Sequence, residues 1–189
     1  SKLRETGEMW LLLEYCEEGD LKSFVVKNQE LFRKSFENSK LGNTIYSRLL
    51  IIWAYHIAKG MEYLAGKRIM HGDLAARNIL IGCGDHDCLN LVAKVADFGL
   101  SKQLATKGYY RKTIRNYVPW KWMAFEYLED NRFQLKSDVW SYGVVIWEMF
   151  SLGEQPYGHK TSDEVFNQLK GGYHLQCPEV IKKIKHWAA

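Results

Sequence analysis

The stretch HGDLAARNIL, from His71 to Leu80, places an acid, a cation and an amide among small apolar residues. Asp73, Arg77 and Asn78 are its acid, its cation and its amide, and only leucine and alanine stand between the acid and the cation. A loop whose only role is to connect two elements needs no such arrangement. The spacing therefore indicates a site that performs chemistry.

A second acid follows at a distance that a hairpin can close. The stretch LVAKV, residues 91–95, reads as a short strand and leads into Asp97, and the stretch NILIG after Arg77 reads as another strand. Two antiparallel strands would bring Asp73, Asn78 and Asp97 together. Asp and Asn oxygens suit magnesium, and a second Asp suits the role of proton acceptor for a hydroxyl nucleophile. The pattern therefore indicates phosphoryl transfer.

These motifs resemble those of the protein kinase family, whose signatures are H-R-D-L-x-x-x-N and D-F-G. Here they stand as HGDLAARN and DFG. The resemblance implies an α+β protein-kinase-like fold, of which this chain would be the mainly helical C-terminal lobe with short β-hairpins and no N-terminal lobe. It implies ATP and Mg²⁺ as cofactors, Asp73 as the catalytic base, and Asn78 and Asp97 as magnesium ligands.

The same resemblance assigns supporting roles to further residues. His71 and Phe98 would form a buried stack that holds the catalytic loop, and Gly99 would let the backbone swing. The other implied contacts are Leu13 as gatekeeper, the backbone of Glu14 and Cys16 facing adenine, Leu80 as the floor under adenine, and Asp138 bonded to the backbone of the catalytic loop.

The position of the cation indicates the tyrosine-specific branch of the family. Serine/threonine kinases usually carry Lys two residues after the catalytic Asp, where this chain has Ala75, and Arg77 takes its place. A tyrosine reaches further than a serine, so a cation set back from the base can neutralise the phosphate without blocking the ring. VPWKWMAFEYL, with Pro119 and Trp122, resembles the peptide platform of tyrosine kinases. The implied reaction is transfer of the ATP γ-phosphate to protein tyrosine.

Finer features resemble receptor tyrosine kinases. They are the order LAARN, which also occurs in several cytoplasmic tyrosine kinases, and the pair Tyr109 and Tyr110, which are predicted activation-loop phosphorylation sites. The implied partners are ATP, protein substrates with tyrosine, a second receptor copy and phosphotyrosine-binding proteins. The implied location is the cytosol, on the inner side of the plasma membrane if the parent is a receptor.

Two positions depart from the family pattern. Gly72 stands where the family has an Arg that holds a phosphorylated activation loop, so we expect weaker coupling between phosphorylation and activity. Phe125 replaces the Pro of A-P-E, and Glu126 is expected to lack its usual Arg partner. The alternative function is therefore a pseudokinase or adaptor that acts by protein binding, although the intact acids and amide argue against it.

The segment LEYCEEGDL, residues 13–21, resembles the hinge between the two lobes of a kinase. The stretch SKLRETGE before it contains none of the N-terminal-lobe features that bind the phosphates of ATP, which are a Gly-rich loop, a strand Lys and a helix Glu. We therefore expect residues 1–189 to form one partial kinase domain that is inactive by itself. A chain of 189 residues, 47% of them hydrophobic, is enough for one core.

Composition narrows the partners and the compartment. Lys and Arg number 26 against 22 Asp and Glu, and this mild excess is spread along the chain, which argues against nucleic-acid binding. No apolar run reaches the roughly 18 to 20 residues of a membrane span, and the polar start lacks a signal-peptide profile. Four cysteines fit a reducing compartment. Cys83 and Cys88 flank possible metal ligands, but the spacing favours a plain hairpin turn with free thiols.

Periodicity predicts the remaining elements. They are a buried strand over 10–13, a short helix over 21–28, a polar looping stretch over 29–43, an amphipathic helix from Thr44 to Ala65, a long mobile loop over 98–118, a helix buried on nearly every side from Ser137 to Gly153, and helices beginning at Thr161 and after Pro178. Ser137 and Gly153 are the expected N-cap and stop of the central helix, and Thr161 begins a capping box.

Overall fold

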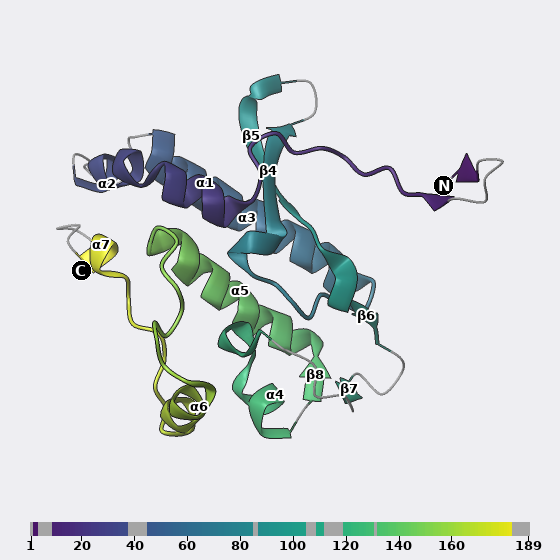
Figure 1. Ribbon diagram of the computed structural model, residues 1–189, viewed down its shortest axis with the longest axis vertical. Coiled ribbons are helices and arrows are strands. Elements are labelled where there is room, and N and C mark those ends of the chain that lie inside the picture. Colours follow the sequence, from purple (N-terminus) through teal and green to yellow (C-terminus); the bar gives the residue numbers. More distant parts are fainter. Residues whose placement is uncertain are drawn as a thin grey trace.

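Short antiparallel strand pairs join a mainly helical body in the computed structural model, which describes residues 2–3, 9–37, 45–84, 87–104, 109–111, 119–130 and 132–182 (Figure 1). The helices are α1 (Leu21–Lys27), α2 (Gln29–Glu37), α3 (Ile45–Gly66), α4 (Phe125–Asp130), α5 (Leu135–Phe150), α6 (Ser162–Lys170) and α7 (Glu179–Lys182). The strand pairs are β1 (Lys2–Leu3) with β2 (Met9–Trp10), β3 (Ile69–Met70) with β6 (Lys102–Gln103), β4 (Ile79–Gly84) with β5 (Asp87–Val95), and β7 (Tyr109–Arg111) with β8 (Arg132–Gln134). The predicted α+β architecture is confirmed.

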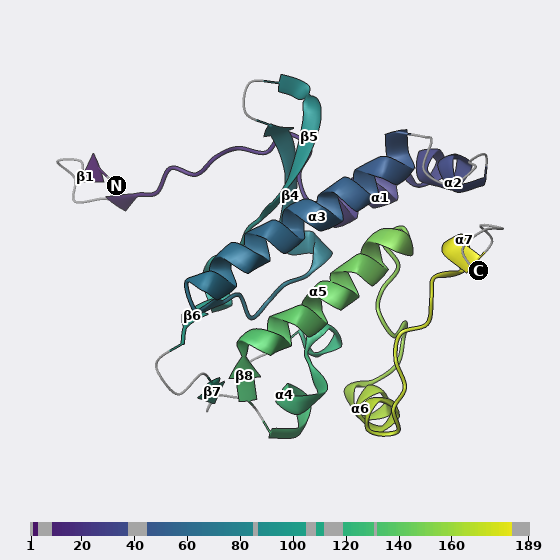
Figure 2. The ribbon, with the colours of Figure 1, turned by 180° about the vertical axis from the view of Figure 1, so that it is seen from behind.

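The two longest helices, α3 and α5, lie side by side, and the β4–β5 hairpin stands against α3 (Figures 1 and 2). Helix α3 follows the predicted three- and four-residue periodicity, with Trp53 and Ile57 fully buried. The Trp53 indole N–H donates to the carbonyl of Leu91 at 3.1 Å, and the Tyr142 hydroxyl donates to the carbonyl of Ala54 at 3.0 Å. These bonds fix both the hairpin and α5 on one helix.

The main core lies where α1, α3, α5 and the hairpin meet. Its fully buried members include Leu21, Val25, Leu50, Trp53, Ile57, Ile79, Ile81, Val145 and Met149. The segment between β3 and β4 carries the HGDLAARN motif and lies directly on this core, since Leu74 and Ala76 are buried in it. A close-packed core therefore supports this motif.

The predicted loop over residues 29–43 is wrong in its first part, because residues 29–37 form α2. Phe32 and Phe36 are one helical turn apart and both are buried, and the Phe32 ring meets the edge of Tyr46 with centroids 5.3 Å apart. A single pair of apolar residues at this spacing is enough to hold a short amphipathic helix on α3. Residues 38–43 lie outside the described ranges.

Helix α5 differs from its prediction at both its start and its surface. The N-cap is Gln134, and Ser137 is the third helical residue, where it completes a capping box with Gln134. Val139 is 68% exposed, so one face of the helix is uncovered within the described residues. The predicted stop is confirmed, since Gly153 has φ +86° and its N–H donates to the Glu148 carbonyl at 2.8 Å.

Three further helix predictions are confirmed. Helix α1 begins after Asp20, whose carboxylate accepts the Ser23 N–H at 2.9 Å. Thr161 and Glu164 form the predicted capping box of α6, and α7 follows Pro178.

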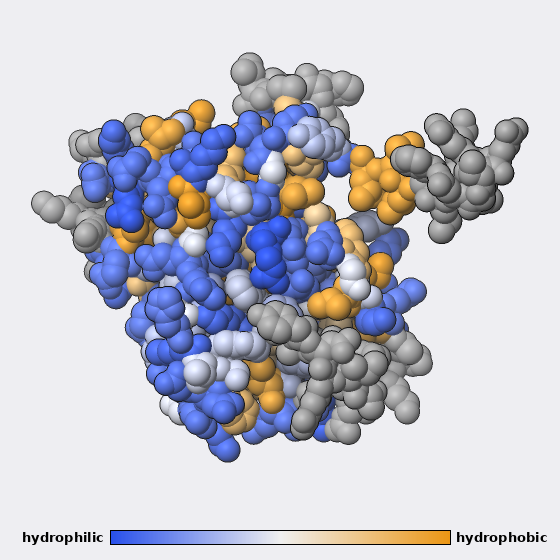
Figure 3. Space-filling view, viewed as in Figure 1, coloured by the Kyte–Doolittle hydropathy of each residue, from blue (hydrophilic) through white to orange (hydrophobic). Residues whose placement is uncertain are grey.

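The predicted buried strand over 10–13 is wrong. Only Met9–Trp10 forms a strand, β2, and the following Leu11, Leu12 and Leu13 are 77%, 91% and 79% exposed. Figure 3 shows this apolar segment apart from the body of the molecule. An apolar run becomes a buried strand only where a second layer covers it, and no described element does so here.

The predicted long loop over 98–118 is wrong for three short pieces, which form a 3₁₀ turn at Phe98–Leu100 (η2) and the strands β6 and β7. Cys16 and Cys177 are free thiols, and the described residues contain no cluster of metal-ligating side chains. Asp85 and His86, which the alternative metal site requires, lie outside the described ranges.

No helix in the described parts of the chain is long and apolar enough to cross a bilayer.

Candidate active site

The β4–β5 hairpin brings the two signature motifs together, as the sequence predicts. Ile79 pairs with Val95, and the Ala96 N–H donates to the Asn78 carbonyl at 2.9 Å. Asn78 therefore precedes one strand at the same end of the hairpin where Asp97 follows the other.

Asp73 is held inside its own loop. Its Oδ1 accepts a hydrogen bond from Arg77 Nη2 at 2.6 Å, and its carbonyl accepts one from Asn78 Nδ2 at 2.7 Å. The side chain of Asp73 is 16% exposed and that of Arg77 is 38% exposed. The predicted acid, cation and amide thus form one cluster, in which Arg77 and Asn78 lie in the 3₁₀ turn Ala76–Asn78 (η1) and Asp73 precedes it.

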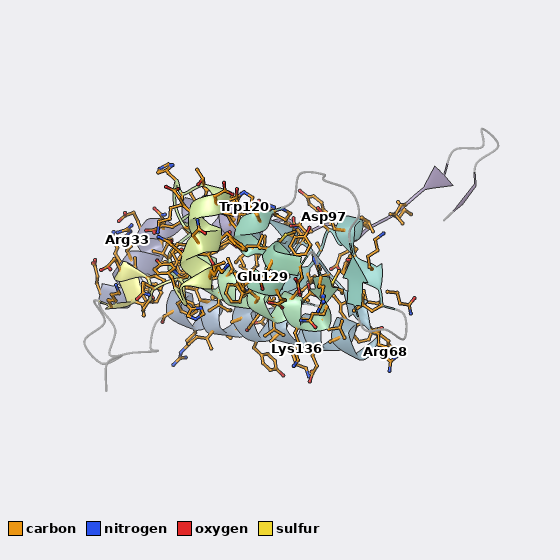
Figure 4. All side chains as sticks on the ribbon, turned by 90° about the horizontal axis from the view of Figure 1, so that it is seen from below. Arg33, Arg68, Asp97, Trp120, Glu129 and Lys136 are labelled. Atoms are coloured by element: carbon orange, nitrogen blue, oxygen red, sulfur yellow. The ribbon has the colours of Figure 1, made fainter. Side chains whose placement is uncertain are left out.

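Asp97 has a left-handed backbone conformation, with φ 58°, and its Oδ1 accepts the Gly99 N–H at 3.2 Å. Asp and Asn tolerate this region better than most residues because their short polar side chains bond locally. Asp97 is exposed at the end of the hairpin. In Figure 4, Asp97 and Trp120 lie along one edge of the molecule, and Arg68 and Lys136 lie along the opposite edge.

His71 and Asp138 fix the backbone of the catalytic loop, as the resemblance implies. The Asp138 carboxylate accepts the N–H groups of His71 and Gly72 at 2.8 and 3.0 Å, and burial raises the pKa of this carboxyl. His71 is fully buried, with Nε2 3.0 Å from the Ala96 carbonyl. Its ring lies 5.3 Å from that of Phe98, but Phe98 is 49% exposed, so the stack is only half-buried.

Gly72, which departs from the family pattern, has a backbone conformation that suits glycine. Its φ is +78°, in the region that favours glycine, and a Cβ atom here would approach the carbonyl oxygen of Leu100 to 3.3 Å. An arginine at this position would therefore be strained in the present conformation.

A cavity of about 450 Å³ opens beside the Asp73–Arg77 pair. Its lining residues are Asp73, Arg77, Leu100, Pro119, Trp120, Lys121, Trp122 and Gln155. The segment Trp120–Trp122 forms a 3₁₀ turn (η3), and the Arg77 guanidinium lies 4.5 Å above the centre of the Trp122 ring. The predicted platform residues Pro119 and Trp122 thus share the cavity with the predicted base.

Sequence reasoning missed Lys121 and Glu148. Lys121 is buried, donates to the Gly158 carbonyl and lies 5.3 Å from the Trp120 ring centre, and burial lowers the pKa of its ammonium group. Glu148 is 1% exposed within α5. A lone acid in the apolar run VVIWEMF is the signal that could have identified Glu148.

Glu126 has hydrogen-bond partners other than the Arg that the family pattern supplies. Its Oε1 accepts hydrogen bonds from Gln134 Nε2 at 3.3 Å and from Ser137 Oγ at 3.5 Å. Phe125 stacks on Phe166 of α6, with ring centroids 5.5 Å apart and an interplanar angle of 26°. Both departures around the A-P-E position are therefore accommodated by local contacts.

The structure does not test the predicted adenine contacts. Glu14 forms an ion pair with Lys94, and Cys16 lies against Gly82 of β4, whereas Leu13 points into solvent. Leu80 is half-buried. The four contacts with adenine stay a prediction.

The two predicted phosphorylation sites lie in β7, where the backbone of Tyr109 pairs with Gln134 and that of Tyr110 with Phe133. The side chains of both tyrosines lie outside the described part of the chain. Their phosphorylation stays a prediction.

Comparison with known proteins identifies the family. The model of the protein tyrosine and serine/threonine kinase family matches residues 2–187. The chain is 38% identical over 182 residues to a fibroblast growth factor receptor of Ciona intestinalis, covering 93% of this chain and 23% of that protein. It is 37% identical to fibroblast growth factor receptor homolog 1 of Drosophila melanogaster (92% and 24% covered) and 38% identical to the tyrosine kinase receptor Cad96Ca of the same species (92% and 22%). The chain thus spans about a quarter of the length of these relatives, and it belongs to the protein tyrosine and serine/threonine kinase family.

Proposed function

We propose that these residues are the catalytic-loop portion of a tyrosine protein kinase, which transfers the γ-phosphate of ATP to tyrosine side chains of proteins. The observation that carries the proposal is the cavity in which Asp73 and Arg77 face Pro119 and Trp122. A base, a cation and an adjoining surface for a peptide are the parts that phosphoryl transfer to a protein hydroxyl requires.

In this proposal Asp73 accepts the proton of the substrate phenol. Its Oδ1 is occupied by Arg77, so Oδ2 is the oxygen that faces a bound hydroxyl. As the phenolic oxygen bonds to the γ-phosphorus, the bond from phosphorus to the leaving oxygen of ADP breaks and the proton moves to Asp73. The Arg77 guanidinium then neutralises charge on the transferred phosphate.

The oxygen donors at the hairpin end fit a magnesium ion. Asn78 uses its amide nitrogen to bond the loop, which leaves its amide oxygen for a cation, and Asp97 presents an exposed carboxylate at the same end of the hairpin. Asn78 and Asp97 would hold Mg²⁺, which when bound would neutralise the phosphates of ATP. The proposed adenine contacts are Leu13, the backbone of Glu14 and Cys16, and Leu80.

Receptor relatives support a finer proposal. The proteins of Ciona and Drosophila that match this chain are named as receptors. We infer that the parent protein carries this domain on the cytosolic side of the plasma membrane, pairs with a second copy, and is phosphorylated at Tyr109 and Tyr110, where phosphotyrosine-binding proteins would attach.

A second candidate is a pseudokinase that acts by protein binding. The left-handed Gly72 favours it, because the residue that would couple the loop to phosphorylation has been replaced in a backbone conformation that disfavours its return. The intact cluster of Asp73, Arg77 and Asn78 weighs against it.

The test is phosphate transfer by the full-length protein to a tyrosine peptide, with Mg²⁺ and ATP. We expect activity in the wild type and loss of at least about a hundredfold in Asp73→Asn, which keeps the shape of the side chain. We expect no transfer by residues 1–189 alone. The pseudokinase would be favoured if the wild type is inactive and if the wild type and Asp73→Asn bind partner proteins equally well.

A further inference from the structure

Glu148 joins two parts of the site that are distant in sequence. A single oxygen, Oε2, accepts the backbone N–H of Ala76 at 2.9 Å and the indole N–H of Trp122 at 2.8 Å. Ala76 stands between Asp73 and Arg77 in the catalytic loop, and Trp122 ends the turn η3 that lines the cavity. One buried atom thus fixes how far the loop lies from the platform.

Two neighbouring contacts extend this junction. The Arg77 guanidinium rests on the Trp122 ring at 4.5 Å and bonds to Asp73 at 2.6 Å. The Ser141 hydroxyl, from the same helix as Glu148, donates to the Trp122 carbonyl at 2.7 Å. A displacement of Trp122 would therefore reach Asp73 through Arg77.

The stability of the fold does not account for an acid at this position. The second oxygen of Glu148, Oε1, is buried and has no hydrogen-bond partner within the described residues, and burial raises the pKa of the carboxyl. An apolar residue of similar volume would fill the space without this cost. A buried polar atom that is left unsatisfied calls for a functional reason.

We propose that Glu148 is a positioning residue, which holds Ala76 and Trp122 at a fixed separation and thereby seats the substrate peptide against Asp73. This inference rests on the proposed kinase function. The acceptor oxygen of Glu148 is the group that performs this role. Glu148 acts on the substrate indirectly, through the catalytic loop on one side and the peptide platform on the other.

The experiment compares steady-state kinetics of the full-length kinase and its variants, with peptide and ATP varied separately. Glu148→Leu removes the acceptor, and we expect the KM for peptide to rise about tenfold and kcat to fall, with the KM for ATP within about twofold. Glu148→Gln keeps an acceptor oxygen and should restore most of the loss. Trp122→Phe keeps an aromatic ring under Arg77 but removes the indole N–H that bonds to Glu148, and it should also raise the KM for peptide.

Two controls separate positioning from general damage. Met149→Ala opens a cavity beside Glu148 in the core and should lower stability while leaving both KM values unchanged. In the double variant Glu148→Leu with Trp122→Phe, the KM for peptide should rise by less than the product of the two single effects, because both changes remove the bond between Glu148 and Trp122.

The outcomes distinguish this inference from the proposed function. An inactive wild type overturns the function itself. An active wild type in which Trp122→Phe leaves the KM for peptide unchanged, or in which Glu148→Gln is as impaired as Glu148→Leu, overturns the positioning role. If Glu148→Leu does not fold, Trp122→Phe alone decides the question, because an unchanged KM for peptide in that variant overturns the positioning role.

Discussion

Arg77 has two partners of different kinds, and this limits which residue can replace it. Its guanidinium donates to Asp73 at 2.6 Å and lies above the Trp122 ring at 4.5 Å. A planar fork satisfies both contacts at once, whereas a lysine ammonium is a compact point charge that can satisfy only one of them well.

Arg77→Lys in the full-length kinase should therefore behave as a damaging substitution. We expect kcat/KM for a tyrosine peptide to fall about tenfold to a hundredfold, since the charge is kept but Asp73 and Trp122 are no longer joined. Arg77→Ala should fall further. Equal kcat/KM in wild type and Arg77→Lys would show that charge alone is sufficient.

The buried carboxyl of Glu148 makes stability depend on pH in a direction that can be measured. Burial raises its pKa above the ordinary value of 4.5, so the folded chain binds this proton more tightly than the unfolded chain. The tighter binding of this proton stabilises the folded chain fully at pH values below 4.5, and this stabilisation is lost as pH rises through the pKa of the folded state. Each unit of elevation corresponds to about 1.4 kcal/mol.

Glu148→Gln removes this titration and keeps the acceptor oxygen. As pH rises above 4.5, the free energy of unfolding of the wild type should therefore fall relative to that of Glu148→Gln, as measured by denaturant unfolding. Glu164→Gln is the control of opposite sign. Hydrogen bonds from Thr161 lower the pKa of Glu164. The free energy of unfolding of the wild type should therefore rise relative to that of Glu164→Gln as pH rises.

At the residue scale, the sequence predicted the members of the Asp73–Arg77–Asn78 cluster but not Glu148, which bonds to the same loop. Asp73, Arg77 and Asn78 stand within six residues, so local spacing reveals them. The bond from Glu148 to Ala76 spans 72 residues, and no periodicity in the chain encodes such a contact. Only the three-dimensional arrangement of α5 and the loop brings it about.

At the scale of elements, success depended on local signals. The capping box at Thr161 and the repeating apolar face of α3 are local, and both elements form as predicted. Helix α2 was missed because only Phe32 and Phe36 mark its buried face, and because that face exists only once α3 supplies a surface. Polar composition then outweighed the helical period in the interpretation of the sequence.

The end of α5 provides a test with its own control in the same helix. Gly153 has φ +86°, and a Cβ atom there would lie 2.5 Å from Cγ2 of Val26. Gly143 lies in the helix interior, where an added Cβ atom would meet no described atom within 4 Å beyond the backbone of its own helix. Alanine therefore fits at position 143 without a clash.

We therefore expect Gly153→Ala to lower the free energy of unfolding by about 1 to 3 kcal/mol, because it adds strain and a steric clash. Gly143→Ala should raise it by about 0.5 to 1 kcal/mol, since alanine is the better helix former. Denaturant unfolding of both variants measures the difference. Equal effects would mean that Gly153 does not need its left-handed conformation.

At the scale of the whole molecule, the segment after β2 is exposed although its sequence is that of a buried strand. Leu11, Leu12 and Leu13 are between 77% and 91% exposed and contiguous, and Tyr15 nearby is 80% exposed. Apolar residues scattered singly over a surface are ordinary, but a continuous run of this kind promotes association. The prediction that this apolar segment is buried is wrong, because burial depends on a second layer of structure that the local sequence pattern does not reveal.

This exposure predicts that the 189-residue chain associates with itself through the segment 11–13. Replacing Leu11 and Leu13 with Glu should shift the sedimenting species toward the monomer at equal protein concentration, because charge opposes edge-to-edge contact of extended segments. The matched control is Ile51→Glu, at a position that is 58% exposed on the helix α3 and is not part of an extended run. Association that persists in the double variant, or that is lost equally in Ile51→Glu, would assign the contact to another surface of the molecule.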